Sequence, residues 1–365
     1  MTYLLKHSNK RRIKIDDDEQ RYFLMDLSNT AVVILNWNGI THLDRYMPSV
    51  IAHSQNASII IADNGSTDDS INFILTNFPT VRVIRLDKNY GFAGGYNKAL
   101  EQVSEAYIVL LNSDVEVTPN WLEPVITRMA LDPMIAVAQP KIKSDEDRDY
   151  FEYAGAAGGM LDKLGYPFCR GRIFDCLERD SGQYEAEAEL FWAGGCALFI
   201  RNSLYRAAGG LDPHFFAHFE EIDLCWRIKR MGYKIMYVPG STVYHLGGGT
   251  LPTNHPRKTY LNFRNNLVML YKNLSPDTLF STIVIRLLAD GIAGIKFLLS
   301  GQFRSCMQIV KAHWSFFIHL PTWNAKRKAL ADIPYINNTA GRWNHSIVWA
   351  YYVSKITTYS SLSDD

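Results

Sequence analysis

The segment YIVLLNSDVE, residues 107–116, indicates the fold of this 365-residue chain. Its first half, residues 107–111, is short, apolar and rich in Ile, Val and Leu, which is typical of a buried strand. Asp114 follows at the mouth of that strand, where open α/β sheets bind ligands. If the strand continues, Asn112, Asp114 and Glu116 share one face, and their oxygens suit Mg²⁺ or Mn²⁺ carrying a diphosphate. A polar turn after a core strand is the alternative interpretation.

The flanking sequence alternates between strand-like and helix-like patterns. This alternation predicts βαβ units and a mostly parallel sheet flanked by helices. The expected strands are residues 31–36, 58–63, 81–86, 107–111 and 134–139, and the expected helices are 42–54, 68–77, 93–104 and 119–131. Further along, residues 191–200, 234–238 and 242–245 are strand-like, and residues 220–231 predict a helix ending at Gly232. Residues 140–190 suggest hairpins or a mobile loop.

Composition excludes several classes of protein. The net charge of +1 gives no electrostatic reason to expect a nucleic-acid partner. Five cysteines without a CxxC pair disfavour a disulfide scaffold or a structural zinc site, so a reducing compartment is expected. Residues 1–29 are polar and lack the apolar region of a signal peptide, and we expect them to be an N-terminal extension.

The C-terminal part, residues 276–365, is expected to be helical. Residues 279–299 are strongly apolar but include Arg286, Asp290 and Lys296, which disfavours a membrane-spanning helix. Basic residues beside apolar ones, followed by many Trp, Phe and Tyr residues, fit helices that lie on a membrane surface. An ordinary helical domain packed on the catalytic core explains the same pattern, and the sequence does not separate the two.

Two polar segments follow the second and third predicted strands. Asp63 precedes a Gly-Ser turn and is placed to accept a hydrogen bond from a nucleotide base or ribose; a structural capping role is the alternative. Asn89 begins a glycine-rich segment, residues 89–97, that opens a helix. Glycines there let a backbone approach a ligand, and a helix N-terminus attracts phosphate. The segment is not GxGxxG, which disfavours nicotinamide binding.

Three later features are candidates for binding or catalysis. Gly194 and Gly195 interrupt an apolar strand after Trp192, which often marks close approach of a ligand. A helix begins with three acids that either interact with its dipole or include a general base; they are Glu220, Glu221 and Asp223. His245 ends a strand and is either a metal ligand or a structural residue.

Taken in order, these motifs resemble one known family. The segments are DNGSTD from Asp63, NYGFAGG from Asn89, LLNSD ending at Asp114, WAGG ending at Gly195, EEIDLCWR from Glu220, and His245. Their order is similar to that of the inverting GT-A glycosyltransferases of family two, and most similar to the rhamnosyltransferase-like members. The resemblance covers about residues 30–275 and implies a GT-A nucleotide-diphospho-sugar transferase domain there, followed by the C-terminal helical extension.

The resemblance also implies roles for individual residues. Glu221 would be the catalytic base, with Asp223 as the second candidate. Asp114 and His245 would bind Mg²⁺ or Mn²⁺. The residues implied to bind the nucleotide sugar are Asn36, Asp63, Asn89, Gly91, Gly95, Asn97, Asn112 and Arg264. Those implied to contact the acceptor are Trp192, Gly194, Gly195 and Glu220.

The function implied is inverting transfer of a sugar, with rhamnose as a candidate, from a nucleoside-diphosphate sugar to a glycan or lipid-linked saccharide. Such a protein would act in cell-surface polysaccharide synthesis, in the cytoplasm or peripherally on the inner face of the membrane. A sugar-phosphate nucleotidyltransferase is one rival, but it needs a basic glycine-rich loop after the first strand, where this chain has NWNG from Asn36. A non-catalytic carbohydrate-binding protein is the other rival, and it predicts loss of the acids at 114 and 221.

Overall fold

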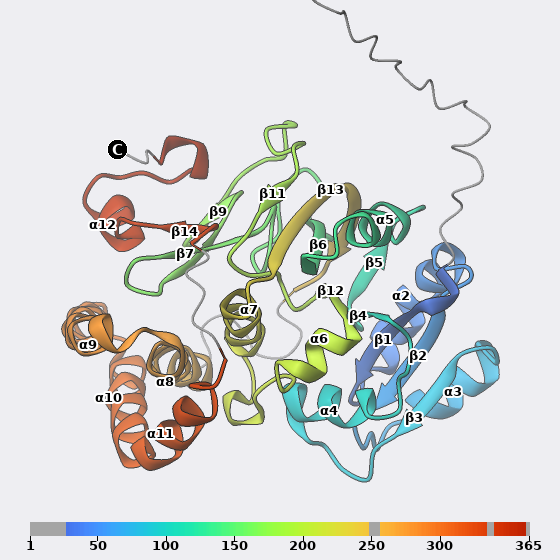
Figure 1. Cartoon of the computed structure of the whole chain (residues 1–365), viewed down its shortest axis with the longest axis horizontal. Coiled ribbons are helices and arrows are strands. Elements are labelled where there is room, and N and C mark those ends of the chain that lie inside the picture. Colours follow the sequence, from blue (N-terminus) through green and yellow to red (C-terminus); the bar gives the residue numbers. More distant parts are fainter. Residues whose placement is uncertain (1–26, 248–255, 334–338, 363–365) are drawn as a thin grey trace, which may run out of the picture.

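The computed structural model describes residues 27–247, 256–333 and 339–362. Most of the predicted N-terminal extension therefore lies outside the described residues. The main element is a nine-stranded sheet with the order β11-β13-β6-β12-β4-β1-β2-β3, in which β5 also pairs with β13 (Figure 1). One half of it is parallel and comprises β1 (Thr30–Asn36), β2 (Ser58–Asp63), β3 (Arg82–Arg85) and β4 (Tyr107–Asn112). These strands confirm the predicted βαβ region.

Helices cover both faces of this half-sheet. They are α2 (Ile40–His53), α3 (Ser70–Asn77), α4 (Gly91–Leu100) and α5 (Glu123–Leu131), close to the predicted ranges, although α5 begins four residues after Pro119. Side chains of β1 alternate between two cores, because Ala31 and Val33 join one buried cluster while Val32 and Ile34 join the other. Burial on both faces explains why the parallel strands have continuous apolar sequences.

The other half of the sheet is mixed. It contains β6 (Ile135–Ser144), β11 (Ala188–Glu189), β12 (Ala197–Arg201), β13 (Lys234–His245) and the short β5 (Val115–Val117). β12 is antiparallel to both β4 and β6. The two strands expected at 234–238 and 242–245 are one strand, β13, with a bulge between Val238 and Thr242. The strand expected at 191–200 begins only at Ala197. Helix α7 (Glu220–Arg230) ends before Gly232, whose φ of 88° suits the predicted terminal glycine.

A second sheet lies where the sequence suggested hairpins or a mobile loop. Its order is β10-β9-β8-β7-β14, with β7 (Gly159–Asp162), β8 (Pro167–Cys169), β9 (Arg172–Ile173) and β10 (Cys176–Leu177) connected as antiparallel hairpins. Its last strand, β14 (Arg342–Trp343), comes from the C-terminal region and pairs in parallel with β7. The predicted C-terminal extension therefore contributes a strand to a sheet whose other strands lie within residues 159–177.

The C-terminal region is helical, as predicted. It contains α9 (Pro276–Leu299), α10 (Phe303–Ile318), α11 (Leu320–Ala329) and α12 (Ile347–Tyr352), and it follows α8 (Pro256–Asn273), which lies within residues 30–275. Helix α8 packs against α9, α10, α11 and also α7 (Figure 1). Among the described helices, none is both long enough and apolar enough to cross a membrane. The shorter elements are α6 (Asn202–Ala207) and the 3₁₀ turns Leu27–Asn29, Pro213–Phe215 and Tyr359–Ser361.

Candidate active site

The carboxyl ends of β1 and β2 bring Asn36 and Asp63 together. Asn36 Nδ2 lies 3.5 Å from Asp63 Oδ1 and donates to Ser66 Oγ at 3.1 Å. Asp63 borders a pocket of about 440 Å³ that Gly65, Ser66 and Arg85 also line. That volume is in the range of pockets that hold small-molecule ligands. Asp63 therefore has the placement expected of a nucleotide contact, while the fully buried Asn36 orients the turn behind it.

Asn64 holds two loops at the edge of this pocket, although the sequence did not single it out. Its Nδ2 donates to Asn89 Oδ1 at 3.0 Å and to the Gly91 carbonyl at 3.1 Å. Asn89 Oδ1 also accepts from the Gly91 amide at 2.8 Å. Gly65 has a φ of 73°, and a Cβ there would lie 2.7 Å from the facing backbone. Asn89 and Gly91 thus join the start of α4 to the loop after β2, but neither of them lines the pocket.

Two residues expected to bind nucleotide are instead occupied by protein contacts. A Cβ on Gly95 would lie 2.8 Å from Leu35 Cδ1, so the glycine lets α4 pack closely on β1. Asn97 donates through Nδ2 to the Leu211 carbonyl at 2.7 Å, and its Oδ1 accepts from Tyr205 Oη at 2.5 Å. These contacts do not support a nucleotide role for Gly95 or Asn97.

Asp114 and His245 approach each other at the end of β4. His245 Nε2 lies 3.2 Å from Asp114 Oδ1 and 3.4 Å from Asn112 Nδ2. The expectation that Glu116 shares a face with them is wrong, because β4 ends at Asn112 and a turn separates it from β5. Glu116 is paired with Arg148 at 2.7 Å instead.

This pair suits a divalent cation. Burial opposes ionisation of Asp114, but its hydrogen bond to His245 and the charge of that ring lower the pKa of the carboxyl group. The 3.2 Å separation of the two donor atoms is close to the edge of an octahedron with Mg²⁺-like bonds, about 3 Å. Glu152 Oε1 lies 3.3 Å from His245 Nδ1, which is an ion-pair distance, but no hydrogen bond joins the two atoms in the described chain. No sequence signal indicated Glu152.

Within the described residues, no group of three or more His, Cys, Asp or Glu side chains is arranged to hold a metal ion. Asp114 and His245 would therefore supply only part of a coordination shell. The remaining positions would be filled by a ligand or by water, as is usual where Mg²⁺ binds together with phosphates.

Glu221 occupies the first turn of α7, beside Gly195. A Cβ on Gly195 would lie 3.8 Å from Glu221 Cβ. Oε2 of Glu221 and Oε2 of Glu220 are buried and have no hydrogen-bond partner in the described chain. Burial raises the pKa of Glu221 to about 7, and burial together with the Glu221 charge raises the pKa of Glu220 well above its usual value. Gly195 is followed by Cys196, whose carbonyl accepts from the Asn112 amide at 2.9 Å, so Glu221 and the Asp114–His245 pair flank the same short segment.

Asp223 has a different environment from Glu221. It is fully buried, and it accepts from Arg227 Nε at 2.9 Å, Lys272 Nζ at 2.8 Å and Asn273 Nδ2 at 2.8 Å. Although burial opposes it, the charges of Lys272 and Arg227 lower its pKa. Because both carboxylate oxygens are engaged, this geometry counts against Asp223 as the alternative base.

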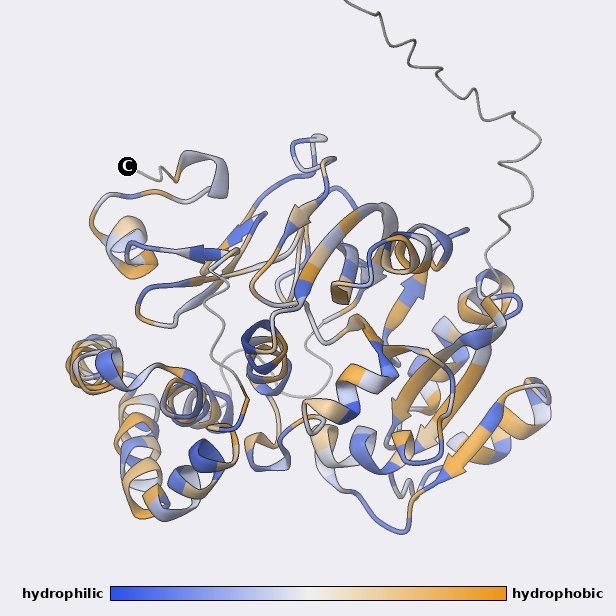
Figure 2. Cartoon of the chain, viewed as in Figure 1, coloured by the Kyte–Doolittle hydropathy of each residue, from blue (hydrophilic) through white to orange (hydrophobic). Residues whose placement is uncertain are grey.

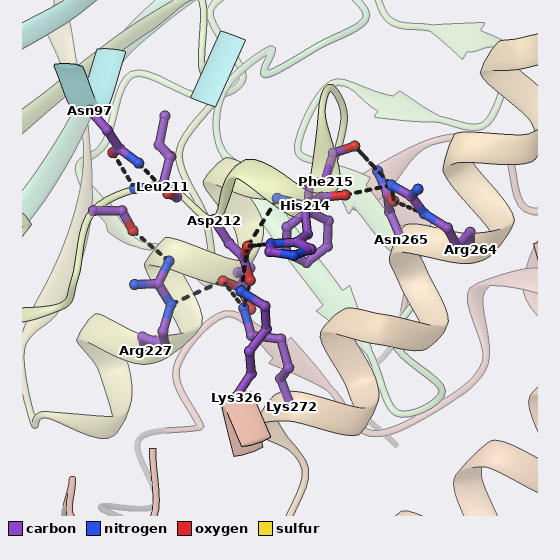
Figure 3. Close-up of polar contacts among 12 residues, drawn as sticks. Asn97, Leu211, Asp212, His214, Phe215, Arg227, Arg264, Asn265, Lys272 and Lys326 are labelled. Carbon is purple, nitrogen blue, oxygen red and sulfur yellow. Dashed lines mark hydrogen bonds and ion pairs between the residues drawn. The ribbon is translucent and has the colours of Figure 1, made fainter. Parts of the chain in front are cut away.

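The loop that leads into α7 is strained. Phe216, His218 and Phe219 have φ values of 66°, 69° and 74°, which are unfavourable for residues other than glycine. Asn265 of α8 stabilises this conformation with its side-chain amide (Figure 3). Its Nδ2 donates at 2.8–3.0 Å to the carbonyls of Phe215, Ala217 and His218.

Arg264 reinforces the same loop. Its Nη2 donates to the His214 carbonyl at 2.7 Å and to the Phe215 carbonyl at 3.1 Å (Figure 3). The diphosphate contact implied by the family resemblance is therefore replaced here by loop contacts. Asp212, at the start of the loop, is paired with Lys272 at 2.7 Å and Lys326 at 2.9 Å.

Of the residues expected to contact the acceptor, Gly195 and Glu220 lie next to Glu221. Trp192 is buried and donates through Nε1 to the Met160 carbonyl at 2.9 Å. A Cβ on Gly194 would lie 2.5 Å from the Ala154 carbonyl oxygen. Trp192 and Gly194 are therefore packing residues in this structure.

Comparisons with known proteins agree with this arrangement. The model of the family described as glycosyl transferase family 2 matches residues 31–206. An N-acetylglucosaminyl-diphospho-decaprenol L-rhamnosyltransferase of Mycobacterium tuberculosis is 26% identical over 231 residues, covering 59% of this chain and 75% of the relative. N-acetylgalactosaminyltransferase 4 of Drosophila melanogaster is 26% identical over 67% of this chain and 40% of the relative.

Two solved structures share the fold at low sequence identity. TarS of S. aureus has a TM-score of 0.52 and 15% identity, over 82% of this chain and 52% of that one. GalNAc-T7, solved with UDP, GalNAc and Mn²⁺, has a TM-score of 0.50 and 19% identity, over 67% of this chain and 47% of that one.

The sheet order, the flanking helices and these likenesses define a glycosyltransferase with the GT-A fold. Residues 31–206, which carry Asp63, Asp114 and Gly195, match the model of glycosyl transferase family 2. Glu221 and His245 lie beyond that matched segment, and the fold brings them back to it through Gly195 and Asp114.

Proposed function

We propose that this glycosyltransferase moves a sugar from a nucleoside diphosphate to a hydroxyl group of a lipid-linked saccharide, with inversion at the anomeric carbon. The Glu221 carboxylate is the observation that carries the proposal. The residue is half-buried beside Gly195, its Oε2 is buried without a hydrogen-bond partner in the described chain, and burial raises its pKa to about 7. Such a carboxylate exchanges a proton near neutral pH, as a general base must.

The proposed reaction is a single displacement. Asp63 would accept hydrogen bonds from the base or ribose at the donor pocket. Glu221 would take the proton of the acceptor hydroxyl while the oxygen of that hydroxyl bonds to the anomeric carbon. The bond from that carbon to the diphosphate oxygen breaks, and the nucleoside diphosphate leaves with the bonding electrons. Mg²⁺ or Mn²⁺, held by Asp114 and His245, would neutralise charge on the departing diphosphate.

Rhamnose is the first donor sugar to test, and a saccharide on a diphospho-lipid is the first acceptor. The relative from Mycobacterium tuberculosis is named as an L-rhamnosyltransferase acting on N-acetylglucosaminyl-diphospho-decaprenol, and it supports both choices. We infer a role in cell-surface polysaccharide synthesis at the cytoplasmic face of the membrane. All five cysteines are free in the structure, which is compatible with a reducing compartment.

A panel of UDP-, GDP- and dTDP-sugars, each with Mn²⁺, tests the proposal through thermal stabilisation and then transfer. Bound donor raises the melting temperature by mass action. We expect one donor to stabilise both the wild type and Glu221→Gln, whereas only the wild type transfers sugar at an appreciable rate. Stabilisation by no donor at millimolar concentration contradicts nucleotide-sugar binding. Wild-type transfer by Glu221→Gln contradicts the base assignment.

A further inference from the structure

Helix α9 has its polarity reversed relative to a helix of a water-soluble protein. Its buried side chains include Thr282, Arg286 and Asp290. Arg286 Nη2 lies 3.3 Å from Asp290 Oδ1, and Asp290 Oδ2 lies 3.1 Å from His313 Nε2 of α10. Most of its exposed side chains from Phe280 onward are apolar, with Ser281 and Lys296 as exceptions, and the large ones are Phe280, Val284, Ile285, Leu288, Ile292, Ile295, Leu298 and Leu299.

Helix α10 extends this apolar surface. It packs against α9 and exposes Phe303, Met307, Val310, Trp314, Phe317 and Ile318. Together with the exposed residues of α9, these side chains make up what we call the outer helical face. Figure 2 shows that both helices are rich in apolar residues. Single exposed apolar residues are ordinary, but a continuous set on two adjacent helices indicates a surface that binds a protein or a membrane.

The charge of the surrounding sequence selects among the possible partners. From Gly291 to Ala331 the chain has no Asp or Glu and six basic residues, which are Lys296, Arg304, Lys311, Lys326, Arg327 and Lys328. The side chains of Lys296, Arg304 and Lys311 are exposed on α9 and α10. A second copy of this chain would set these cations against identical cations, whereas anionic lipid headgroups would neutralise them.

We propose that the outer helical face lies in the surface of an anionic lipid bilayer, with its apolar side chains among the acyl chains and its basic residues at the headgroups. The buried Arg286–Asp290–His313 cluster then faces the protein, as polar groups of membrane-bound helices do. This proposal does not depend on the chemistry at Glu221. Membrane binding would hold Glu221 near the lipid surface. Helix α8 packs on α9 and α10, and its Asn265 also holds the loop before Glu221.

Co-sedimentation of the full-length protein with vesicles tests the proposal. The vesicles contain either phosphatidylcholine alone or phosphatidylcholine with phosphatidylglycerol, at low and high salt. The test variant combines Leu288→Glu with Trp314→Glu, whose wild-type side chains are 67% and 69% exposed. The matched control is Leu131→Glu on α5, which is 73% exposed and far from the face in sequence. Because all three side chains are exposed, we expect melting temperatures to stay near that of the wild type.

We expect binding to the phosphatidylglycerol vesicles that weakens at high salt, falls at least tenfold in the double variant and is unchanged in Leu131→Glu. Equal sedimentation of the wild type and the double variant would overturn the proposal, and so would absence of the wild type from the vesicle pellet. Sedimentation velocity without lipid tests whether the outer helical face forms a dimer instead. A concentration-dependent dimer that the double substitution dissociates would assign the face to a second copy of the chain instead.

Discussion

Lys272 of α8 places its Nζ 2.8 Å from Oδ2 of Asp223 in α7, and both side chains are buried. The same Nζ lies 2.7 Å from Asp212, where the loop that precedes α7 begins (Figure 3). One ammonium group thus connects the two ends of the segment that presents Glu221. The C-terminal helices are therefore part of the framework of the active site.

Lys272→Met should destabilise the protein strongly, because it leaves two buried carboxylates without their shared cation. Removing one partner of a buried ion pair costs roughly 3–5 kcal/mol, and a protein of this size loses about 1–2 °C of melting temperature per kcal/mol. Calorimetry of Lys272→Met measures the loss. Lys98→Met breaks an exposed pair with Glu101 and serves as the control, for which we expect a change near zero. Equal melting temperatures for the two variants would contradict the structural role of Lys272.

Asn265→Leu should lower both stability and turnover. The substitution keeps the side chain's approximate size but leaves the Ala217 and His218 carbonyls without their side-chain donor, while Arg264 still donates to the Phe215 carbonyl; we expect a cost of roughly 2–4 kcal/mol. The strained loop would then relax and move Glu221. The neighbouring Asn266 is a matched control, because it is equally buried but donates to the Gly165 carbonyl, away from the loop.

Transfer rates for the two asparagine variants separate positioning from stability. We expect kcat to fall at least tenfold in Asn265→Leu at a temperature where both variants are folded, and to change little in Asn266→Leu. A double variant with Glu221→Gln should lose no more activity than Glu221→Gln alone. An equal loss in both asparagine variants would mean that Asn265 contributes only to stability.

Turnover should depend on ionisation of Glu221. A general base acts in its ionised form, and burial raises the pKa of this carboxyl to about 7. We therefore expect kcat/KM to rise as the pH increases through about 7 and then to level off. Glu221→Gln should be roughly 10²-fold slower or more and should lack this rising limb. If kcat/KM of Glu221→Gln still rises with pH as in the wild type, the rise belongs to another ionisable group.

The same raised pKa predicts a cost in stability at high pH. The unfolded chain ionises Glu221 near its ordinary pKa of 4.5, but the folded chain does so only near 7. Between these values the folded state binds more protons, so the free energy of unfolding falls as the pH rises and stays low above about 7. Glu221→Gln should therefore be more stable than the wild type at pH 8, by about 3 kcal/mol at most. The difference should shrink toward pH 4.5, and denaturant unfolding of both proteins across this range measures it. A constant difference would rule out this titration.

Local sequence patterns predicted the elements whose contacts are local. The alternation of β1 to β4 with α2 to α5 is visible because each strand is a buried apolar run and each helix has its own periodicity. The pairing of β14 with β7 joins residues about 180 apart, and no local pattern indicates it. Equally, the sequence does not distinguish Glu221 from Asp223, because the difference lies in Lys272 and Asn273, about 50 residues away.

Glycine and asparagine residues were the hardest to assign. Gly91 and Gly95 belong to one glycine-rich motif, yet Gly91 has a φ of 73° at the start of α4 while Gly95 lets Leu35 pack against the helix. Asn97 belongs to the same motif and binds the Leu211 backbone. The glycines indicated that the backbone of this segment packs closely against a neighbour. Only the fold shows whether that neighbour is a ligand or another part of the chain.

Metal binding should depend on Asp114 and be tuned by Glu152. We expect the protein to bind Mn²⁺ more tightly when UDP or another nucleoside diphosphate is present, because Asp114 and His245 supply only two of the donor atoms. Asp114→Asn should weaken Mn²⁺ binding at least tenfold, and Glu152→Gln should weaken it less, since it removes only the carboxylate charge 3.3 Å from His245 Nδ1. Glu116→Gln is the control, because Glu116 is paired with Arg148 outside the site. Electron paramagnetic resonance of free Mn²⁺ measures binding without turnover, and melting temperatures confirm that each variant is folded. If Asp114→Asn and Glu116→Gln bind Mn²⁺ equally, the Asp114–His245 pair is not the metal site.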